Sequence, residues 1–262
     1  MARNYQYIYG RNTVVEAIKN NRSISKIFIQ SSENSAKAKN GISKEKNSVS
    51  REIENLVSKR GNISIQYLNK QEFNNLSLKF LKENCNHQGV IAEVFEYNYY
   101  QLDDLVSNNE NSLIVALDGL EDPHNLGAIV RTSEISGVDG IIIPKNRSVQ
   151  VNSTVSKVST GAIEYVKVAQ VTNIRQALKE LKAEGYWIVG AEYTNQSIDF
   201  WKADLKRKLC VVIGSEGKGI SRIVREECDY LVKIPMWGKI NSLNASVSAA
   251  LIIYEARRQQ NN

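Results

Sequence analysis

From residue 113 onward, short apolar runs alternate with segments of helical spacing, and this alternation restricts the possible folds more than any other feature. The apolar runs lie at residues 113–118, 140–143, 164–168, 186–191, 209–213 and 231–234. Helices are predicted at residues 126–136, 172–184 and 242–258. Strands that alternate with helices in this way are typical of a parallel α/β sheet.

The first 97 residues have a different pattern and are predicted to form a small mixed α/β domain. A short helix is expected after Gly10 and another one ending at Gly61, with strands at residues 26–30, 63–67 and 88–97. Residues 31–50, mostly Ser, Asn, Lys and Glu, are expected to be a solvated loop or a frayed helix start. The polar residues 98–112 are expected to link this domain to a second one at residues 113–262.

The composition excludes several classes of protein. With 42% hydrophobic and 24% charged residues, the chain has the composition of a globular protein rather than a fibrous or disordered one. Its longest apolar runs are too short to cross a bilayer, so we expect a cytoplasmic protein with no membrane partner. Three cysteines and two histidines show no CxxC or HxxxH spacing, so neither disulfides nor a metal site are expected.

The net charge of +6 is unevenly distributed along the chain. Residues 1–97 contain 15 basic and 9 acidic residues, whereas residues 98–262 contain 19 of each. A basic first domain favours an anionic partner. The alternative is that these lysines only keep a surface soluble.

The first segment that can carry chemistry is the passage from a strand into a helix at residues 117–132. Asn125 lies where a helix cap is expected, and Gly127 leaves room beside the first turn. Arg131 follows six residues later, so a phosphate at the helix N-terminus would lie within reach of Asn125 and Arg131. Alternatively, Asn125 only caps the helix and Arg131 only pairs with an acidic neighbour.

The second segment is a glycine-rich turn after the strand at residues 209–213. The spacing of Gly214, Gly217 and Gly219 matches neither the dinucleotide pattern GxGxxG nor the Walker pattern, which disfavours a nicotinamide-dependent oxidoreductase. Glu216 within this turn is either a solvated charge or a partner for an arginine or a hydroxyl.

The third segment leads from the strand at residues 231–234 into the last helix. Ser242, Asn244 and Ser246 stand at the predicted start of this helix, which is more than one cap requires. Small residues up to Ala250 allow the helix to pack closely against its own sheet or against another chain.

Together, the three segments resemble the signature motifs of the SpoU/TrmH (SPOUT) family of RNA ribose 2′-O-methyltransferases. The matching residues are Asp122-Pro-His-Asn-Leu-Gly-Ala-Ile-x-Arg131, Ile-Gly-Ser-Glu-Gly217 and Ile-Pro followed by Ser-Leu-Asn-x-Ser246. In the first domain, Tyr9-Gly-Arg-Asn and His87-Gln-Gly-Val90 are similar to the substrate-binding domain of bacterial enzymes that methylate guanosines of 23S ribosomal RNA.

The resemblance implies an α/β fold in which a trefoil-knotted, parallel-sheet methyltransferase domain follows a small α/β substrate-binding domain. It also implies that S-adenosyl-L-methionine is the cofactor and that the protein is a homodimer formed through the last helix. The backbone that would hold the adenosyl group, and the residues near it, are Gly214, Ile234 and Leu243, with Gly217 and Ser246.

The candidate catalytic residues are Asn125, Arg131, Glu216 and Asn244, and by the resemblance Arg131 occupies the key catalytic position of the family. The two asparagine amides are suited to aligning a ribose hydroxyl without adding charge. We expect Arg131 to clamp a phosphate and stabilise an alkoxide rather than to act as a base, because a guanidinium with a pKa above about 12 stays protonated. Glu216 is expected either to orient Arg131 or to accept the proton.

The predicted function is therefore methyl transfer to the ribose 2′-OH of a guanosine in large-subunit ribosomal RNA, with the basic first domain recruiting the RNA. Three alternatives remain open: a ribosomal adenosine, as in antibiotic resistance, a transfer RNA, or an inactive RNA-binding assembly factor. The two-domain organisation argues against transfer RNA, and the intact catalytic set argues against lost activity.

Overall fold

The computed structural model describes residues 5–31, 48–81, 85–240 and 242–261. Most of the polar stretch expected to be a loop or a frayed helix start lies outside these residues. The chain divides into two compact units, the first of which comprises Met1–Tyr97 and Val151–Tyr165. The second comprises Asn98–Gln150 and Val166–Asn262.

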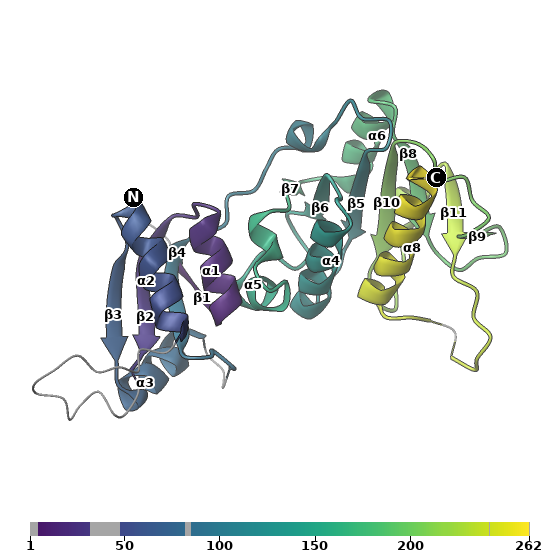
Figure 1. Cartoon of the computed structure of the whole chain (residues 1–262). Coiled ribbons are helices and arrows are strands. Elements are labelled where there is room, and N and C mark those ends of the chain that lie inside the picture. Colours follow the sequence, from purple (N-terminus) through teal and green to yellow (C-terminus); the bar gives the residue numbers. More distant parts are fainter. Residues whose placement is uncertain (1–4, 32–47, 82–84, 241, 262) are drawn as a thin grey trace, which may run out of the picture. The chain divides into compact units, whose positions relative to one another are not determined.

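The first unit contains a four-stranded sheet in the order β1-β4-β2-β3. Its strands are β1 (Tyr5–Tyr9), β2 (Ile24–Gln30), β3 (Ser64–Leu68) and β4 (Val90–Phe95). β4 runs antiparallel to β1 and β2, whereas β2 and β3 are parallel. The helices of this unit are α1 (Arg11–Lys19), α2 (Ser48–Arg60) and α3 (Lys70–Leu81) (Figure 1). The predicted mixed α/β arrangement is confirmed, although the sequence did not predict β1 or α3.

Helix α1 supplies much of the hydrophobic core of the first unit. Val14, Ala17 and Ile18 are completely or almost completely buried and lie in one hydrophobic cluster with strand residues such as Ile27. Gly61 follows α2 with φ +71°, a conformation that glycine adopts without strain, and its N–H bonds to the Val57 carbonyl.

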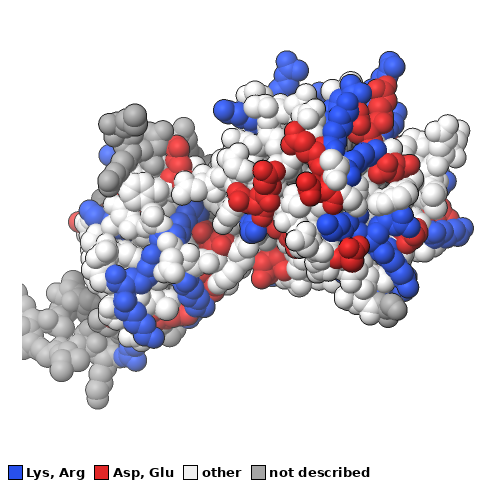
Figure 2. All heavy atoms as spheres, turned by 90° about the horizontal axis from the view of Figure 1, so that it is seen from above, with Lys and Arg blue, Asp and Glu red and all other residues white. Residues whose placement is uncertain are grey.

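Lys and Arg outnumber Asp and Glu on the face of this unit that Figure 2 shows.

The segment Val151–Tyr165 belongs to the first unit, although the sequence analysis included it in the second domain. It contains α5 (Ser153–Val158) and the short 3₁₀ helix η3 (Ala162–Glu164). The Glu164 carboxylate pairs with the Arg22 guanidinium at 2.6 Å, and both side chains are less than a tenth exposed. The strand predicted at residues 164–168 is therefore wrong: its first residue ends a 3₁₀ helix, and the strand starts at Val168.

The second unit contains a seven-stranded sheet in the order β7-β6-β5-β10-β8-β11-β9, and all of its strand pairs are parallel. The strands are β5 (Leu113–Asp118), β6 (Gly140–Pro144), β7 (Val168–Val171), β8 (Trp187–Ala191), β9 (Ile198–Asp199), β10 (Leu209–Gly214) and β11 (Tyr230–Lys233). The parallel sheet predicted from the alternating pattern is confirmed. The two-residue strand β9 is too short to leave a signal in the sequence.

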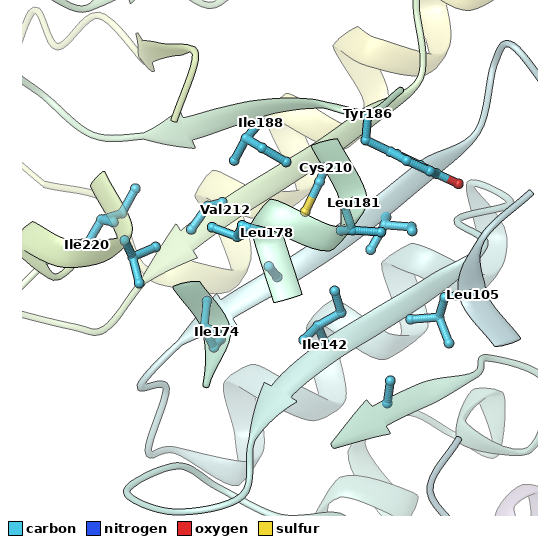
Figure 3. Close-up of a cluster of buried hydrophobic side chains, with 14 residues drawn as sticks. Leu105, Ile142, Ile174, Leu178, Leu181, Tyr186, Ile188, Cys210, Val212 and Ile220 are labelled. Atoms are coloured by element: carbon cyan, nitrogen blue, oxygen red, sulfur yellow. The ribbon is translucent and has the colours of Figure 1, made fainter. Parts of the chain in front are cut away.

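The helices of this unit are α4 (Pro123–Ile135), α6 (Ile174–Ala183), α7 (Arg222–Arg225) and α8 (Ala245–Gln260), and a 3₁₀ helix, η2 (Leu102–Leu105), precedes the sheet. Figure 3 shows how α6 covers one face of the sheet. Its Leu178 and Leu181 are fully buried in a cluster with Ile142 of β6 and Val212 of β10. Each such side chain contributes about 1.5–3 kcal/mol through burial. No described helix is both long and apolar enough to cross a membrane.

Candidate active site

A cavity of about 610 Å³ lies in the second unit, where β8, β10 and β11 end. These three strands are neighbours in a parallel sheet, so the loops that follow them meet at one edge. Seven of the nine predicted site residues line this cavity: Asn125, Gly214, Glu216, Gly217, Ile234, Leu243 and Asn244. Arg131 and Ser246 do not line it.

The glycine-rich turn after β10 forms one wall of the cavity. Ser215 and Gly219 exchange backbone hydrogen bonds of 3.1 and 2.9 Å, which close the turn. A Cβ atom on Gly214 would lie 2.1 Å from the carbonyl carbon of Gly219 and 2.3 Å from the Ile220 nitrogen, closer than atoms can pack. Gly217 has φ +79°, and a Cβ on it would meet nothing within 4 Å. At Gly214 a side chain is excluded by the neighbouring backbone atoms, whereas at Gly217 glycine is favoured because of the positive φ.

The first turn of α4 forms a second wall. Asp122, not Asn125, caps this helix, because the Asp122 carboxylate accepts a hydrogen bond of 2.9 Å from the His124 backbone N–H. That bond is the main reason why the pKa of Asp122 is lowered. Asn125 is only 4% exposed, and its side-chain amide donates a hydrogen bond to Glu216 Oε1. The partner of Glu216 is thus an amide, where the sequence suggested an arginine or a hydroxyl.

Arg131 lies apart from this pair. It is exposed on α4, and within the described residues it makes no hydrogen bond or ion pair. Arg131 follows Asn125 by six positions along the helix, and at 3.6 residues per turn the two side chains leave the helix about 120° apart. Within one chain, Arg131 is therefore not the partner of Glu216.

Asn244 forms the third part of the site and is the N-cap of α8. Its Oδ1 accepts hydrogen bonds from the Ser246 and Val247 backbone N–H groups at 2.9 and 3.4 Å, and from the Ser246 hydroxyl at 2.6 Å. The helix consequently begins at Ala245 and not at Ser242 as predicted. Ser246 acts on the site by fixing Asn244, whose amide nitrogen is not used by the cap.

The cavity also contains residues that the sequence analysis missed. Glu192, Tyr193 and Lys233 line it directly after or at the ends of β8 and β11. The Glu192 carboxylate pairs with the Arg225 guanidinium at 2.6 Å. In the sequence, only their position at or after the end of an apolar strand marks these residues as candidates. Their residue types and spacing do not distinguish them from ordinary surface residues.

The chemistry of the lining fits a cationic ligand with a large organic part. Three carboxylates, Asp122, Glu192 and Glu216, face the cavity together with one lysine. Apolar side chains such as Ile234 and Leu243 complete its walls, and the turns offer backbone groups. In the part of the chain that the structure describes, no three His, Cys, Asp or Glu side chains are placed to hold a metal ion.

Comparison with known families identifies both parts of the chain. The SpoU rRNA Methylase family matches residues 112–254, and the family of RNA 2′-O ribose methyltransferase substrate-binding domains matches residues 7–100. The chain belongs to the SpoU family. It is accordingly an RNA methyltransferase that uses S-adenosylmethionine and carries an N-terminal RNA substrate-binding domain.

Individual relatives agree with this assignment over the whole chain. YacO of Bacillus subtilis (strain 168), named as a member of the TrmH family of tRNA/rRNA methyltransferases, is 42% identical over 265 residues, covering 100% of this chain and 98% of its own length. A Staphylococcus haemolyticus protein named for the same family is 44% identical over 257 residues, covering 97% and 95%.

Two solved structures show the same fold at lower identity. The SpoU methyltransferase AviRb from Streptomyces viridochromogenes, solved in complex with AdoMet, has a TM-score of 0.77 at 22% identity and covers 98% of this chain and 91% of its own. An AdoMet-bound rRNA methyltransferase from Sinorhizobium meliloti has a TM-score of 0.77 at 23% identity, covering 97% and 87%.

Proposed function

We propose that this enzyme transfers the methyl group of S-adenosylmethionine to the ribose 2′-OH of a guanosine in large-subunit ribosomal RNA. The observation that carries the proposal is the cavity at the ends of β8, β10 and β11, which brings seven residues of the three motifs together. The match of residues 7–100 to a substrate-binding family of RNA 2′-O ribose methyltransferases supports the ribose as the target.

The domain organisation supports ribosomal over transfer RNA. The AviRb and Sinorhizobium meliloti structures cover nearly the whole chain, and the latter is named an rRNA methyltransferase. The TrmH/SpoU tRNA modifying enzyme of A. aeolicus covers only 61% of this chain, with a TM-score of 0.53 at 32% identity. The likeness in fold over both units is what favours ribosomal RNA in our proposal.

The cofactor supplies a methyl group on a positively charged sulfur. In our proposal the backbone at Gly214, Ile234 and Leu243 holds its adenosyl part, with Gly217 lining the same cavity. Ser246 contributes through the Asn244 cap rather than by direct contact. Of the three carboxylates that line the cavity, Glu192 is already paired with Arg225. Asp122 and Glu216 make no ion pair within the described residues, and they favour a positive charge in the cavity.

The asparagines position the ribose, and Glu216 takes its proton. The hydrogen bond from Asn125 occupies Glu216 Oε1 and orients the carboxylate, so Oε2 is the proposed acceptor for the 2′-OH proton. The Asn244 amide, fixed by its cap, aligns the hydroxyl oxygen.

Arg131 completes the site from a second subunit in this proposal. Its side chain lies on an exposed face of α4, away from the Asn125–Glu216 pair. α8 and its neighbours expose a set of apolar side chains that a homodimer would cover: Ile135, Leu243, Val247, Leu251 and Tyr254. An arginine brought across such an interface would clamp the phosphate beside the target ribose. The trefoil knot that the resemblance implies stays a prediction.

Arg131→Lys tests the catalytic assignment in the full-length protein. We expect methylation of a 23S ribosomal RNA transcript to fall by about 10²–10³-fold, because a lysine cannot form the bidentate contact. S-adenosylmethionine affinity, measured by calorimetry, should not change. Arg222→Lys, an exposed arginine paired with Glu226 on α7, is the matched control. Normal turnover of the Arg131 variant would refute the assignment.

A map of 2′-O-methylated riboses tests the substrate. We expect ribosomal RNA from cells that lack the gene to have lost the methyl group at one guanosine of the large subunit. Loss of a methyl group at an adenosine would show that guanosine is the wrong nucleotide. Loss in transfer RNA, with an unchanged ribosomal map, would show that ribosomal RNA is the wrong substrate.

A further inference from the structure

Two tryptophans form an exposed stack in the second unit that the proposed chemistry does not use. Trp237 is 84% exposed and Trp201 is 41% exposed. Their ring centroids lie 6.1 Å apart, and the ring planes differ by only 12°. We call Trp201 and Trp237 the tryptophan pair.

The tryptophan pair lies at the same edge of the sheet as the cavity. Trp237 follows β11 by four residues and Trp201 follows β9 by two, and these strands are parallel neighbours. The Phe200 N–H donates a hydrogen bond of 3.0 Å to the Lys233 carbonyl, which holds the two strand ends together. The residue before Trp237, Met236, lines the cavity. Figure 1 shows the segment between β11 and α8 extending beyond the end of β11.

Trp201 is anchored, whereas Trp237 is the outer ring of the stack. Phe200 is 9% exposed, and its ring lies 5.0 Å from that of Trp201. Trp237 adds almost nothing to the core at 84% exposure, and most of its indole is available to a planar ligand.

The charges next to the tryptophan pair favour a phosphate-bearing ligand. Lys239 follows Trp237 by two residues and is exposed, and Lys202 follows Trp201 directly. Lys233 lies at the end of β11, with its Nζ 5.5 Å from the ring centroid of the exposed Tyr193. Lys202 is paired with Asp199 at 2.9 Å, so the positive charge available to a phosphate comes from Lys233 and Lys239, for which the described residues contain no acidic partner. Aromatic rings beside lysines are the usual arrangement for single-stranded nucleic acid.

We propose that the tryptophan pair is a stacking platform for an unpaired base of the RNA, next to the nucleotide whose ribose enters the cavity. The base continues the stack on Trp237, and the lysines contact the phosphates that flank it. This inference rests on the proposed function for the identity of the RNA. It assigns Trp237 to positioning the substrate and not to catalysis.

Binding of short RNAs to the full-length protein tests the platform. The probes are a single-stranded oligoadenylate of about 12 nucleotides and an abasic ribose-phosphate chain of the same length. We expect Trp237→Ala to bind oligoadenylate about five- to tenfold more weakly and the abasic chain unchanged, because only the stack is lost. Trp237→Phe should retain most of the affinity.

Trp187→Ala is the matched control. Trp187 is 42% exposed and begins β8, whereas the cavity lies beyond the other end of that strand. Its replacement should leave binding of both probes unchanged. In turnover assays we expect Trp237→Ala to raise the KM for RNA while kcat stays the same.

Several results would overturn the platform. These are equal oligoadenylate affinity of wild type and Trp237→Ala, no preference of wild type for oligoadenylate over the abasic chain, or loss of S-adenosylmethionine binding in the variant. A change in sedimentation would instead make the tryptophan pair a contact between copies. An unchanged ribosomal methylation map would refute ribosomal RNA as the substrate but would leave the stacking platform standing. Oligoadenylate binding tests the platform whichever RNA is the natural substrate.

Discussion

The two units of this protein use their sheets in different ways. In the second unit every strand pair is parallel, so the loops that follow β8, β10 and β11 lie at one edge of the sheet. These loops, which are far apart in the sequence, line one cavity. In the first unit β4 runs antiparallel to both of its neighbours, so loops leave at both ends of the sheet. The parallel sheet thus brings polar side chains from several loops together at one edge, where they can form a site. The described part of the first unit has no such edge and instead presents a charged surface.

Charge separates the units in the same way. The described residues of the first 97 include nine basic and six acidic side chains. In Figure 2 Lys and Arg predominate on the visible face of the first unit, whereas the second unit shows charges of both signs. We propose that the cavity of the second unit binds the cofactor and that the charged surface of the first unit recruits the RNA, and the variants that follow are expected to separate these two roles.

The largest effect is expected from a single methyl group in the cavity wall. Gly214→Ala places a Cβ 2.1 Å from the Gly219 carbonyl carbon, so the turn has to move. A strain of about 1–3 kcal/mol corresponds to a loss of about five- to 150-fold in S-adenosylmethionine affinity, measured by calorimetry. Gly61→Ala in the first unit, where a Cβ meets nothing within 4 Å, should leave cofactor affinity unchanged. Equal affinities of the two variants would contradict the role of the turn.

The next effect concerns the apolar face of α8. Leu251 is 40% exposed, and Leu251→Lys places a charge in the proposed subunit interface. We expect the dimer to dissociate at concentrations at least about tenfold higher than for wild type, as seen by sedimentation, since a buried unpaired charge costs more than 1.4 kcal/mol. Leu78→Lys on α3, a residue 57% exposed, is the control in the first unit and should not change sedimentation. A monomeric wild type would contradict the homodimer.

A smaller effect is expected from the charged surface of the first unit. Lys26→Glu combined with Lys79→Glu should weaken binding of 23S ribosomal RNA several-fold and lower the salt slope by about 1.4, at about 0.7 for each lost phosphate contact. S-adenosylmethionine affinity should be unaffected. Lys179→Glu combined with Lys182→Glu, on α6 of the second unit, is the matched control. If the control variant loses as much RNA affinity, recruitment is not a property of the first unit.

The smallest functional effect is expected from cysteine alkylation. Burial raises the pKa of Cys210, which is completely inaccessible, and raises that of Cys228 to about 12. At pH 8 both are thiols rather than reactive thiolates, so iodoacetamide should label only the partly exposed Cys85 of the first unit. Mass spectrometry would detect the single adduct, and cofactor affinity should stay the same. Labelling of Cys210 in the native protein would show that the second unit opens.

Local sequence patterns predicted much of the secondary structure. The stripe of Ile174, Ala177, Leu178 and Leu181 predicted α6 to within a few residues, because one face of that helix is buried. The strand at residues 113–118 was predicted with its observed bounds. The strand predicted at residues 164–168 failed because Glu164 pairs with Arg22, a contact within the first unit that no local pattern contains.

The sequence by itself determined the parallel α/β class, the family and seven of the residues that line the cavity, because periodicity and motif order are properties of the chain. Only the tertiary structure decided which of these residues meet. Asn125 and Glu216, 91 positions apart, are joined by a hydrogen bond, and Arg131 points elsewhere. Such contacts depend on strand order and on the direction of each side chain around its helix, neither of which local sequence specifies.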